Sequence, residues 1–309
     1  MAAAYKDGFT TGSVAEVSYD GKLYAMPTET SYSVFAYNKE IFAQYGIDPA
    51  QLQTWDDVKA AGEKLNADGI KIMYQIMPTG PSGSMLWNLF FISRGGNIFD
   101  ENGKVIRDNQ LASDTFRWYY DMKDVSWLSP YSAPTLYQAI KDGKLAAVAT
   151  DSAALSSIKT QAPEMAGKWA FIPWPRWGQD DPKMLGRWGG SAFTIPAKTK
   201  HPEAAWKLVE YLTVTDEGIT AMWETGSLLT SYQAAWDLPA LTATDPFYSD
   251  MSFVDMLKDY EAAPPYYWVN WSQTQTILGT HIDEMFVGAS TPEEAWAAAE
   301  AEIIAKTEK

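Results

Sequence analysis

The sequence predicts an α/β architecture, and two observations support this prediction. Short runs rich in β-branched and aromatic residues alternate along the 309 residues with segments of helical periodicity. Gly, Pro, Asn and Asp punctuate the boundaries between these segments, as turns and helix ends require. The length is enough for about two domains. No single linker divides the chain, so a two-domain arrangement would need the chain to cross between domains more than once.

The first predicted elements are strands. Asp20-Gly21 lies between two β-prone runs, which is a strong signal for a two-residue hairpin. We expect Pro27 to end the second of these strands, because proline cannot donate to a strand ladder. The polar stretch 28–31 should then lead into a separate strand over 33–39.

Cap residues mark the starts of several predicted helices. Thr54 precedes an amphipathic run with Asp57 at the third helical position, and Thr291 with Glu294 forms a capping box. Asp151 or Ser152 lies where a buried strand passes into a helix, so free backbone N–H groups are expected there. Helices are predicted over 55–65, 84–94, 111–124, 152–158, from 202, over 215–226 and from 292.

Glycine and proline shape the middle of the chain. Asn102-Gly103 predicts a second hairpin turn, and the Trp-, Gly- and Pro-rich stretch 168–196 predicts a strand, a loop and a strand at 191–196. His201-Pro202 then opens a helix. One face of this helix is expected to carry Ala205, Leu208, Val209 and Leu212.

Composition excludes several classes of function. The chain has 24 Lys plus Arg against 39 Asp plus Glu, a net charge of −15, so it should repel nucleic acid. It has no cysteine and only His201 and His281, and it lacks phosphate-loop and nucleophile-elbow motifs. We therefore expect no metal and no cofactor. Residues 208–309 hold 17 acidic and 3 basic residues, which predicts either solvated acidic faces or a surface for a basic partner.

The 14 tryptophans are the informative feature. Several lie beside Gly, Pro or polar residues instead of in apolar stripes, namely Trp174, Trp177, Trp188, Trp268 and Trp271. Flat aromatic faces flanked by carboxylates and amides suit sugars, because rings cover C–H faces while polar groups bond the hydroxyls. Paired carboxylates for glycoside hydrolysis remain an alternative, with Glu29, Asp151 and Glu224 near predicted strand ends or loops.

Several segments together resemble one family, the extracellular solute-binding proteins of ABC transporters, in the group that includes maltose-binding protein. The resemblance lies in residues 19–65, 87–104, 142–158, 189–235 and 290–303. It implies a periplasmic-binding-protein-like fold, with two α/β lobes, a hinge and an interlobe cleft. Family members carry about 100 residues before the first matching segment, so the N-terminal lobe is expected to be incomplete. Residues 1–28 plus 190–233 would form it, and 33–185 plus 234–309 the C-terminal lobe.

The resemblance also implies a function. The chain would bind a sugar in the cleft as a monomer, in the periplasm or tethered outside the membrane, and deliver it to permease subunits. No residue would be catalytic. Ala153 and Ala154 replace aromatics of the maltose binder, which argues against maltodextrin. A sugar-sensing domain without a transport role is a further alternative. The ligand-binding residues implied by the resemblance are Glu29, Thr30, Trp87, Asp151, Trp188, Glu224, Ser227, Trp268 and Trp271.

Overall fold

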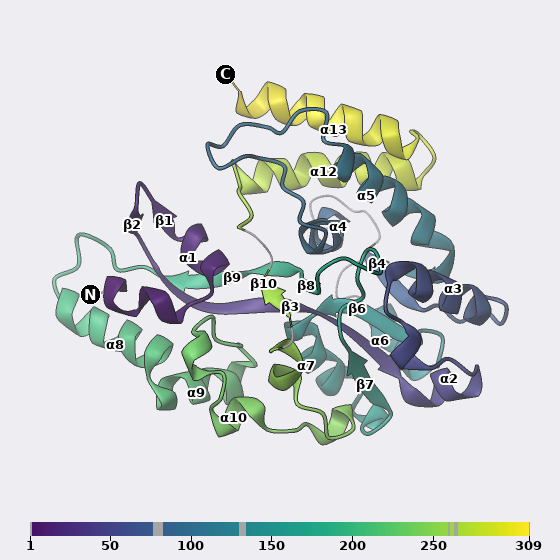
Figure 1. The fold of residues 1–309 in the computed structure, drawn as a ribbon, viewed down its shortest axis with the longest axis horizontal. Coiled ribbons are helices and arrows are strands. Elements are labelled where there is room, and N and C mark those ends of the chain that lie inside the picture. The colour runs from purple at the N-terminus through teal and green to yellow at the C-terminus, as the bar shows by residue number, and fades with distance from the viewer. Residues whose placement is uncertain (1, 77–82, 130–133, 259, 263–264, 309) are drawn as a thin grey trace.

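A long central strand organises the fold (Figure 1). In the computed structural model, which describes residues 2–76, 83–129, 134–258, 260–262 and 265–308, strand β3 spans Met26–Asn38. Its first half pairs antiparallel with β9 (Arg187–Phe193), and its second half pairs antiparallel with β6 (Ala147–Asp151) and β7 (Trp169–Ile172). The strand therefore changes partners near Tyr32 and Ser33, which is where a crossover between lobes is predicted.

The prediction of two separate strands in this region is wrong. β3 passes through Pro27, because its ladder with β9 shifts register between Pro27 and Glu29 and does not need the missing N–H there. β9 also begins earlier than the predicted 191, so Gly189 and Gly190 lie inside a strand.

Most other predicted elements are confirmed, with the caps as expected. The hairpin of β1 (Ser18–Tyr19) and β2 (Lys22–Leu23) turns on Asp20 and Gly21. Thr54 and Thr291 form capping boxes at the starts of α3 (Trp55–Asn66) and α13 (Pro292–Thr307). Phe99 and Val105 form an antiparallel bridge across the turn that contains Asn102-Gly103.

The remaining elements lie within the described residues. The other α-helices are α1 (Thr11–Glu16), α2 (Lys39–Gln44), α4 (Gly83–Ser93), α5 (Gln110–Asp121), α6 (Pro134–Lys141), α7 (Ser152–Gln161), α8 (Pro202–Val214), α9 (Asp216–Gly226), α10 (Pro239–Thr242), α11 (Phe253–Leu257) and α12 (Trp271–Phe286). The other strands are β4 (Met73–Ile76), β5 (Ser126–Ser129), β8 (Met184–Leu185) and β10 (Glu261–Ala262). Short 3₁₀ helices cover Ala2–Gly8, Pro49–Gln51, Met122–Val125, Pro163–Met165, Gln233–Ala235 and Pro246–Tyr248.

Two hydrophobic clusters of unequal size hold the described residues together. The larger includes the β6 and β7 half of β3 and helices α3, α4, α5, α12 and α13, with Trp55 fully buried among aromatic neighbours. The smaller consists of Phe9, Val14, Met26 and Val209, with partly buried side chains around it. Of the four apolar residues predicted on one face of α8, only Val209 is buried, and Leu208 is 60% exposed.

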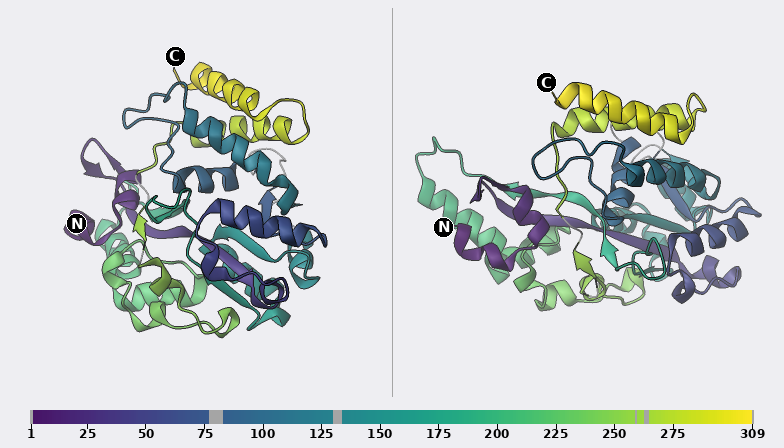
Figure 2. Two further views of the ribbon diagram at one scale, coloured as in Figure 1. Left: turned by 45° about the vertical axis from the view of Figure 1, so that its right-hand side comes forward. Right: turned by 45° about the horizontal axis from the view of Figure 1, so that its top comes forward.

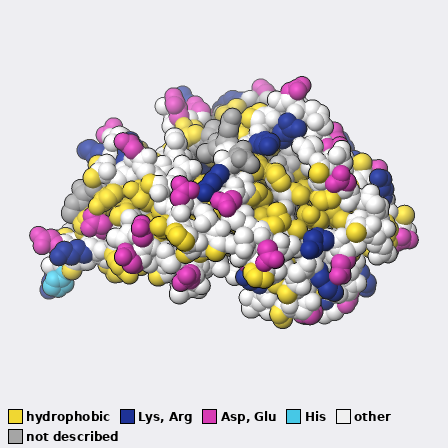
Figure 3. All heavy atoms as spheres, turned by 60° about the horizontal axis from the view of Figure 1, so that its bottom comes forward, with side chains coloured by type: hydrophobic (Ala, Val, Ile, Leu, Met, Phe, Trp, Pro, Cys, Tyr) yellow, Lys and Arg dark blue, Asp and Glu magenta, His cyan; other side chains and the backbone are white. Residues whose placement is uncertain are grey.

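The two further views agree on the arrangement in space (Figure 2). Helices α8 and α9 lie to one side of β3, while α12 and α13 stack with α5 on the other side. One face of the molecule shows acidic and basic side chains scattered among larger hydrophobic areas (Figure 3). Among the described residues, no helix combines the length and the apolar character needed to cross a bilayer. The predicted lobe boundaries stay a prediction.

Candidate ligand-binding cleft

A cleft of about 940 Å³ opens beside the crossover of β3 and β9. One wall includes Ala15, Glu16, Ser18 and Tyr19, at the end of α1 and in β1, and the opposite wall includes residues 100–103, 266–268 and 271. Gly189 and Gly190 of β9 also line it. The volume lies at the upper end of the range usual for ligand pockets, which is roughly 300–1,000 Å³.

The two glycines of β9 are required by the backbone. Gly190 lies so close to β3 that a Cβ atom would stand 2.3 Å from the carbonyl oxygen of Glu29. Gly189 has a φ of +127°, which side-chain-bearing residues rarely adopt. Both positions therefore leave this part of the cleft lining without side chains.

Aromatic rings form the wall opposite α1. The ring centroids of Tyr266 and Trp268 are 4.5 Å apart, and those of Trp268 and Trp271 are 4.1 Å apart with the rings nearly perpendicular. Trp271 begins α12 and is 45% exposed, and Trp268 is half-buried. These rings supply apolar surface that a ligand can reach.

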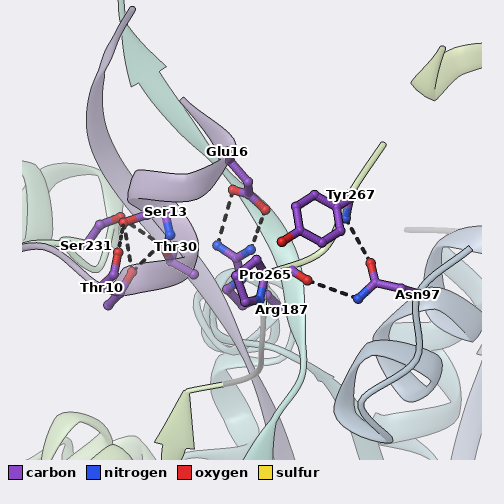
Figure 4. Close-up of polar contacts among 9 residues, drawn as sticks. All are labelled: Thr10, Ser13, Glu16, Thr30, Asn97, Arg187, Ser231, Pro265 and Tyr267. Atoms are coloured by element: carbon purple, nitrogen blue, oxygen red, sulfur yellow. Dashed lines mark hydrogen bonds and ion pairs between the residues drawn. The ribbon is translucent and has the colours of Figure 1, made fainter. Parts of the chain in front are cut away.

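Asn97 fixes the segment that carries these rings. Its Nδ2 donates a hydrogen bond of 3.0 Å to the carbonyl of Pro265, and its Oδ1 accepts one of 2.9 Å from the backbone N–H of Tyr267 (Figure 4). An asparagine that satisfies both a carbonyl and an N–H of an irregular segment holds its backbone in one conformation. The aromatic wall is therefore preorganised.

An ion pair connects α1 to β9 at the cleft. The guanidinium of Arg187 donates two hydrogen bonds to the carboxylate of Glu16, one of them from Nη1 at 3.2 Å (Figure 4). The side chain of Arg187 is 6% exposed and that of Glu16 is 30% exposed. Partial burial raises the pKa of Glu16, and the nearby Arg187 opposes this rise. Gly12 packs against the guanidinium, since a Cβ there would lie 3.1 Å from Cζ.

A small recess of about 40 Å³ lies beside this ion pair. Its lining includes Arg187, Tyr266, Trp268 and Asn88. The Nδ2 of Asn88 donates a hydrogen bond of 2.9 Å to Oε1 of Gln275, which fixes the orientation of the amide. The recess thus combines aromatic surface with an oriented amide and a paired guanidinium.

The lining of the large cleft is acidic. Glu16, Asp100 and Glu101 contribute carboxylates, and among the described residues that line it there is no Lys or Arg. Oδ1 of Asp100 accepts hydrogen bonds from the backbone N–H groups of Asn102 (2.9 Å) and Lys104 (2.8 Å), which holds the turn of this wall. Carboxylates accept hydrogen bonds from hydroxyl groups and repel anions.

The structure places the predicted site residues in two different cavities or outside both. Trp268 and Trp271 line the large cleft. Glu224 and Ser227 line a second cavity, of about 330 Å³, between α9, α7 and α10. The N–H of Thr30 donates to the carbonyl of Leu229, so the chain that follows α9 lies along the edge of β3 opposite β9. The central strand thus separates the two groups.

Four of the other predicted residues, Glu29, Thr30, Trp87 and Asp151, do not line either cavity. The expectation that Trp87 lies near the cleft is wrong, because its side chain is fully buried against Phe91 and Phe116. Thr30 is buried and shares a 2.8 Å hydrogen bond with Ser231 (Figure 4). Asp151 is buried as the N-cap of α7.

The other two predicted residues, Glu29 and Trp188, belong to β3 and β9. Glu29 is partly exposed and pairs with Ser191 of β9. The side chain of Trp188 lies outside the part of the chain that the structure describes, although its backbone belongs to β9.

Sequence reasoning missed the polar half of the cleft. Glu16 and Arg187 are 171 positions apart, and no motif connects them. Tyr19, Asn88 and Asp100 were equally unmarked. The one sequence feature that could have pointed to Arg187 is its position two residues before Gly189 and Gly190, which lie at the predicted crossover. Among the described residues, no group of acidic or histidine side chains could hold a metal ion.

Comparison with known proteins places the chain in a family. A profile of the bacterial extracellular solute-binding protein family matches residues 1–219. The chain is 28% identical over 236 residues to an arabinooligosaccharide-binding protein of Halalkalibacterium halodurans, covering 74% of this chain and 52% of that protein. It is 27% identical over 239 residues to the arabinooligosaccharide-binding protein of Bacillus subtilis, covering 75% and 53%. The chain thus spans about half the length of these curated relatives.

Solved structures share the fold. An ABC transporter-associated binding protein from B. animalis subsp. lactis, in complex with β-1,6-galactobiose, superposes with a TM-score of 0.81 at 21% identity, covering 99% of this chain and 78% of that one. A binding protein of Bifidobacterium longum, in complex with lacto-N-biose, gives 0.76 at 20% identity, covering 99% and 75%. The predicted periplasmic-binding-protein-like fold is confirmed. The protein is a member of the bacterial extracellular solute-binding protein family.

Proposed function

We propose that the protein binds a neutral carbohydrate in the cleft between residues 15–19 and 266–271 and delivers it unchanged to the permease subunits of an ABC importer. The observation that carries the proposal is the combination of accessible aromatic rings with carboxylates in a cleft whose described lining residues include no Lys or Arg. Because the family consists of extracellular solute-binding proteins, we expect the protein to act outside the cytoplasmic membrane.

The aromatic wall suits the apolar side of a sugar. A pyranose or furanose ring presents C–H groups that pack against the faces of Trp268 and Trp271, and burial of that surface contributes roughly 25 cal/mol per Å². The hydroxyl groups project sideways from the ring. Glu16, Asp100 and Glu101 can accept hydrogen bonds from them.

The charge of the cleft selects against anions. A ligand phosphate or carboxylate about 4 Å from the carboxylate of Asp100, which lines the cleft, would be repelled by about 4 kcal/mol at a dielectric constant typical of a protein surface. Arg187 is the one cation at the adjoining recess, among the described residues, and Glu16 already neutralises it. Uronic acids and sugar phosphates are therefore disfavoured relative to neutral sugars.

Ligand binding should favour closure of the two lobes. The cleft walls come from the N-terminal segment 15–19 and from segments of the larger core, and β3 and β9 cross between them. A ligand that contacts both walls binds the closed form more tightly and shifts the population toward it. The proposed hinge lies near residues 28–33 and 185–190, with one chain acting alone.

Relatives with neutral saccharide ligands support the proposal, although other relatives, 25% identical over 297 residues, are named for the anion sn-glycerol-3-phosphate. Two relatives are named for arabinooligosaccharides, and two structures hold galactobiose or lacto-N-biose, none of which carries an ionised group. The hydrolase alternative requires two carboxyl groups free for acid and base roles. The carboxylates predicted for that role, Glu29, Asp151 and Glu224, do not meet in the cleft: Glu224 lines the second cavity, and the other two line neither cavity.

Thermal unfolding in the presence of sugars tests the proposal. The panel consists of arabino-oligosaccharides and β-1,6-linked galacto-oligosaccharides of two to five units, with galacturonate oligomers as the matched anionic series. A ligand at 100 times its Kd adds about 2.7 kcal/mol of stability, which raises the Tm by a few degrees. We expect a shift with a neutral series and recovery of the sugar intact. Shifts confined to the anionic series, or cleavage of the sugar, would contradict the proposal.

A further inference from the structure

The hairpin of β1 and β2 holds an aromatic ring in solvent at the rim of the cleft. Tyr19 is 76% exposed and lines the cleft from the wall opposite Trp268 and Trp271. Among the described residues, the one aromatic ring near it is Tyr24, at a centroid separation of 6.3 Å. A single exposed aromatic is ordinary on a protein surface. This one borders a cavity whose other wall is also aromatic.

The hairpin is built to keep this ring in place. Asp20 and Gly21 both have positive φ, 49° and 70°, as a tight two-residue hairpin turn requires. At the base, the hydroxyl of Ser18 donates a 2.6 Å hydrogen bond to the carbonyl of Val14. Leu23 packs against the smaller hydrophobic cluster. Tyr19 is therefore presented on an anchored hairpin and not on a free loop.

Exposure increases across the cleft from one wall to the other. Tyr266 is buried at the recess, Trp268 is half-buried, Trp271 is 45% exposed, and Tyr19 on the far wall is 76% exposed. A ligand seated against the first three rings fills the inner end of the cleft. Further sugar units would extend toward the hairpin, because the cavity continues to Ser18 and Tyr19.

We infer that Tyr19 forms an outer stacking subsite, and that the cleft prefers oligosaccharides of three or more units to disaccharides. This inference rests on the proposed function. The inner rings bind one end of the ligand whatever its length. Tyr19 adds contact only when the ligand is long enough to reach it, so it determines the length preference of the site.

Calorimetric titration of four proteins tests this inference. Wild type, Tyr19→Ala, Tyr19→Phe and Tyr24→Ala are titrated with the di- and pentasaccharide of the neutral series that stabilises the wild type. One stacking contact supports about a tenfold gain in affinity, so wild type should bind the pentasaccharide about tenfold more tightly. Tyr19→Ala should lose this gain and keep its disaccharide affinity, while Tyr19→Phe retains the ring and the gain.

Tyr24→Ala is the matched control, because Tyr24 is a neighbouring tyrosine, 62% exposed, that does not line the cleft. It should behave as wild type. Unchanged pentasaccharide affinity in Tyr19→Ala, or an equal loss for both ligands, would overturn the outer subsite. If the wild type binds no sugar of any length, the proposed function fails first, and the inference fails with it.

Discussion

Replacement of Asp151 by asparagine should stabilise the protein at neutral pH. Asp151 is 7% exposed, and its Oδ1 accepts a hydrogen bond of 3.0 Å from the N–H of Ala154 at the start of α7. Burial raises the pKa of this carboxyl from 3.8 to about 6, against the smaller opposing effect of backbone N–H groups. The folded state therefore binds a proton more tightly than the unfolded chain does. Its contribution to stability is complete below about pH 3.8 and is lost as the pH rises through about 6.

The size of the expected gain in stability follows from the difference between the pKa of Asp151 in the unfolded chain, 3.8, and in the folded protein, about 6. Keeping the carboxylate ionised in the folded protein at pH 7 costs up to about 3 kcal/mol. Asparagine retains the side-chain oxygen that caps α7 and carries no charge. The unfolding entropy of a chain of 309 residues converts a gain of about 3 kcal/mol in stability into a rise of about 5 °C in Tm.

Urea and thermal unfolding of wild type, Asp151→Asn and Asp151→Ala at about pH 4 and about pH 7 provide the assay. Asp151→Asn should exceed wild type by up to about 3 kcal/mol at pH 7, with little difference at pH 4. Asp151→Ala lacks the cap and should be about 1 kcal/mol less stable than Asp151→Asn at both pH values. A difference between Asp151→Asn and wild type that does not change with pH would refute this reasoning.

Three other predictions concern stability, each measured by urea unfolding. Trp87→Ala should lower the free energy of unfolding by about 3–5 kcal/mol because it leaves a cavity in the core. Trp271→Ala should lower it by less than about 1 kcal/mol because the ring is 45% exposed. Equal losses would contradict the placement of Trp87 in the core and of Trp271 at the surface. Glu16→Gln should lower the free energy of unfolding by about 3–5 kcal/mol, since it leaves the buried Arg187 guanidinium without a counter-charge. Arg187→Gln should cost less, and its cost should shrink from pH 7 to pH 5, because Glu16 is partly exposed and takes up a proton more easily than an ordinary glutamate; the reverse order would be evidence against this. Gly190→Ala should destabilise by forcing β3 and β9 apart, and a neutral effect would show that the strands tolerate a Cβ there.

Local chemistry made much of the fold predictable from the sequence. The Asp20-Gly21 turn, the capping boxes at Thr54 and Thr291, and the Asp151 cap all depend on interactions within a few residues, and all are present. Pro27 led to the wrong prediction that a strand ends there, because whether a proline ends a strand depends on how the partner strand pairs with it. A register shift in the pairing with β9, far along the chain, removes the need for its N–H.

Of the proposed site, the sequence predicted only the aromatic half. Trp268 and Trp271 stood out because their neighbours are polar or turn-forming, and both line the cleft. Trp87 has apolar neighbours in α4 and belongs to the core, so its own sequence context pointed inward. The Glu16–Arg187 pair depends on bringing α1 against β9, which local periodicity does not determine.

The central claim is that the aromatic cleft binds the sugar. The most direct measurement is calorimetric titration of wild type and a Trp268→Ala/Trp271→Ala variant with the neutral oligosaccharide that best stabilises the wild type. Loss of two central aromatic contacts should weaken binding by at least about 100-fold, while the variant still unfolds cooperatively. Affinity equal to that of the wild type would show that the sugar binds elsewhere and would contradict the account.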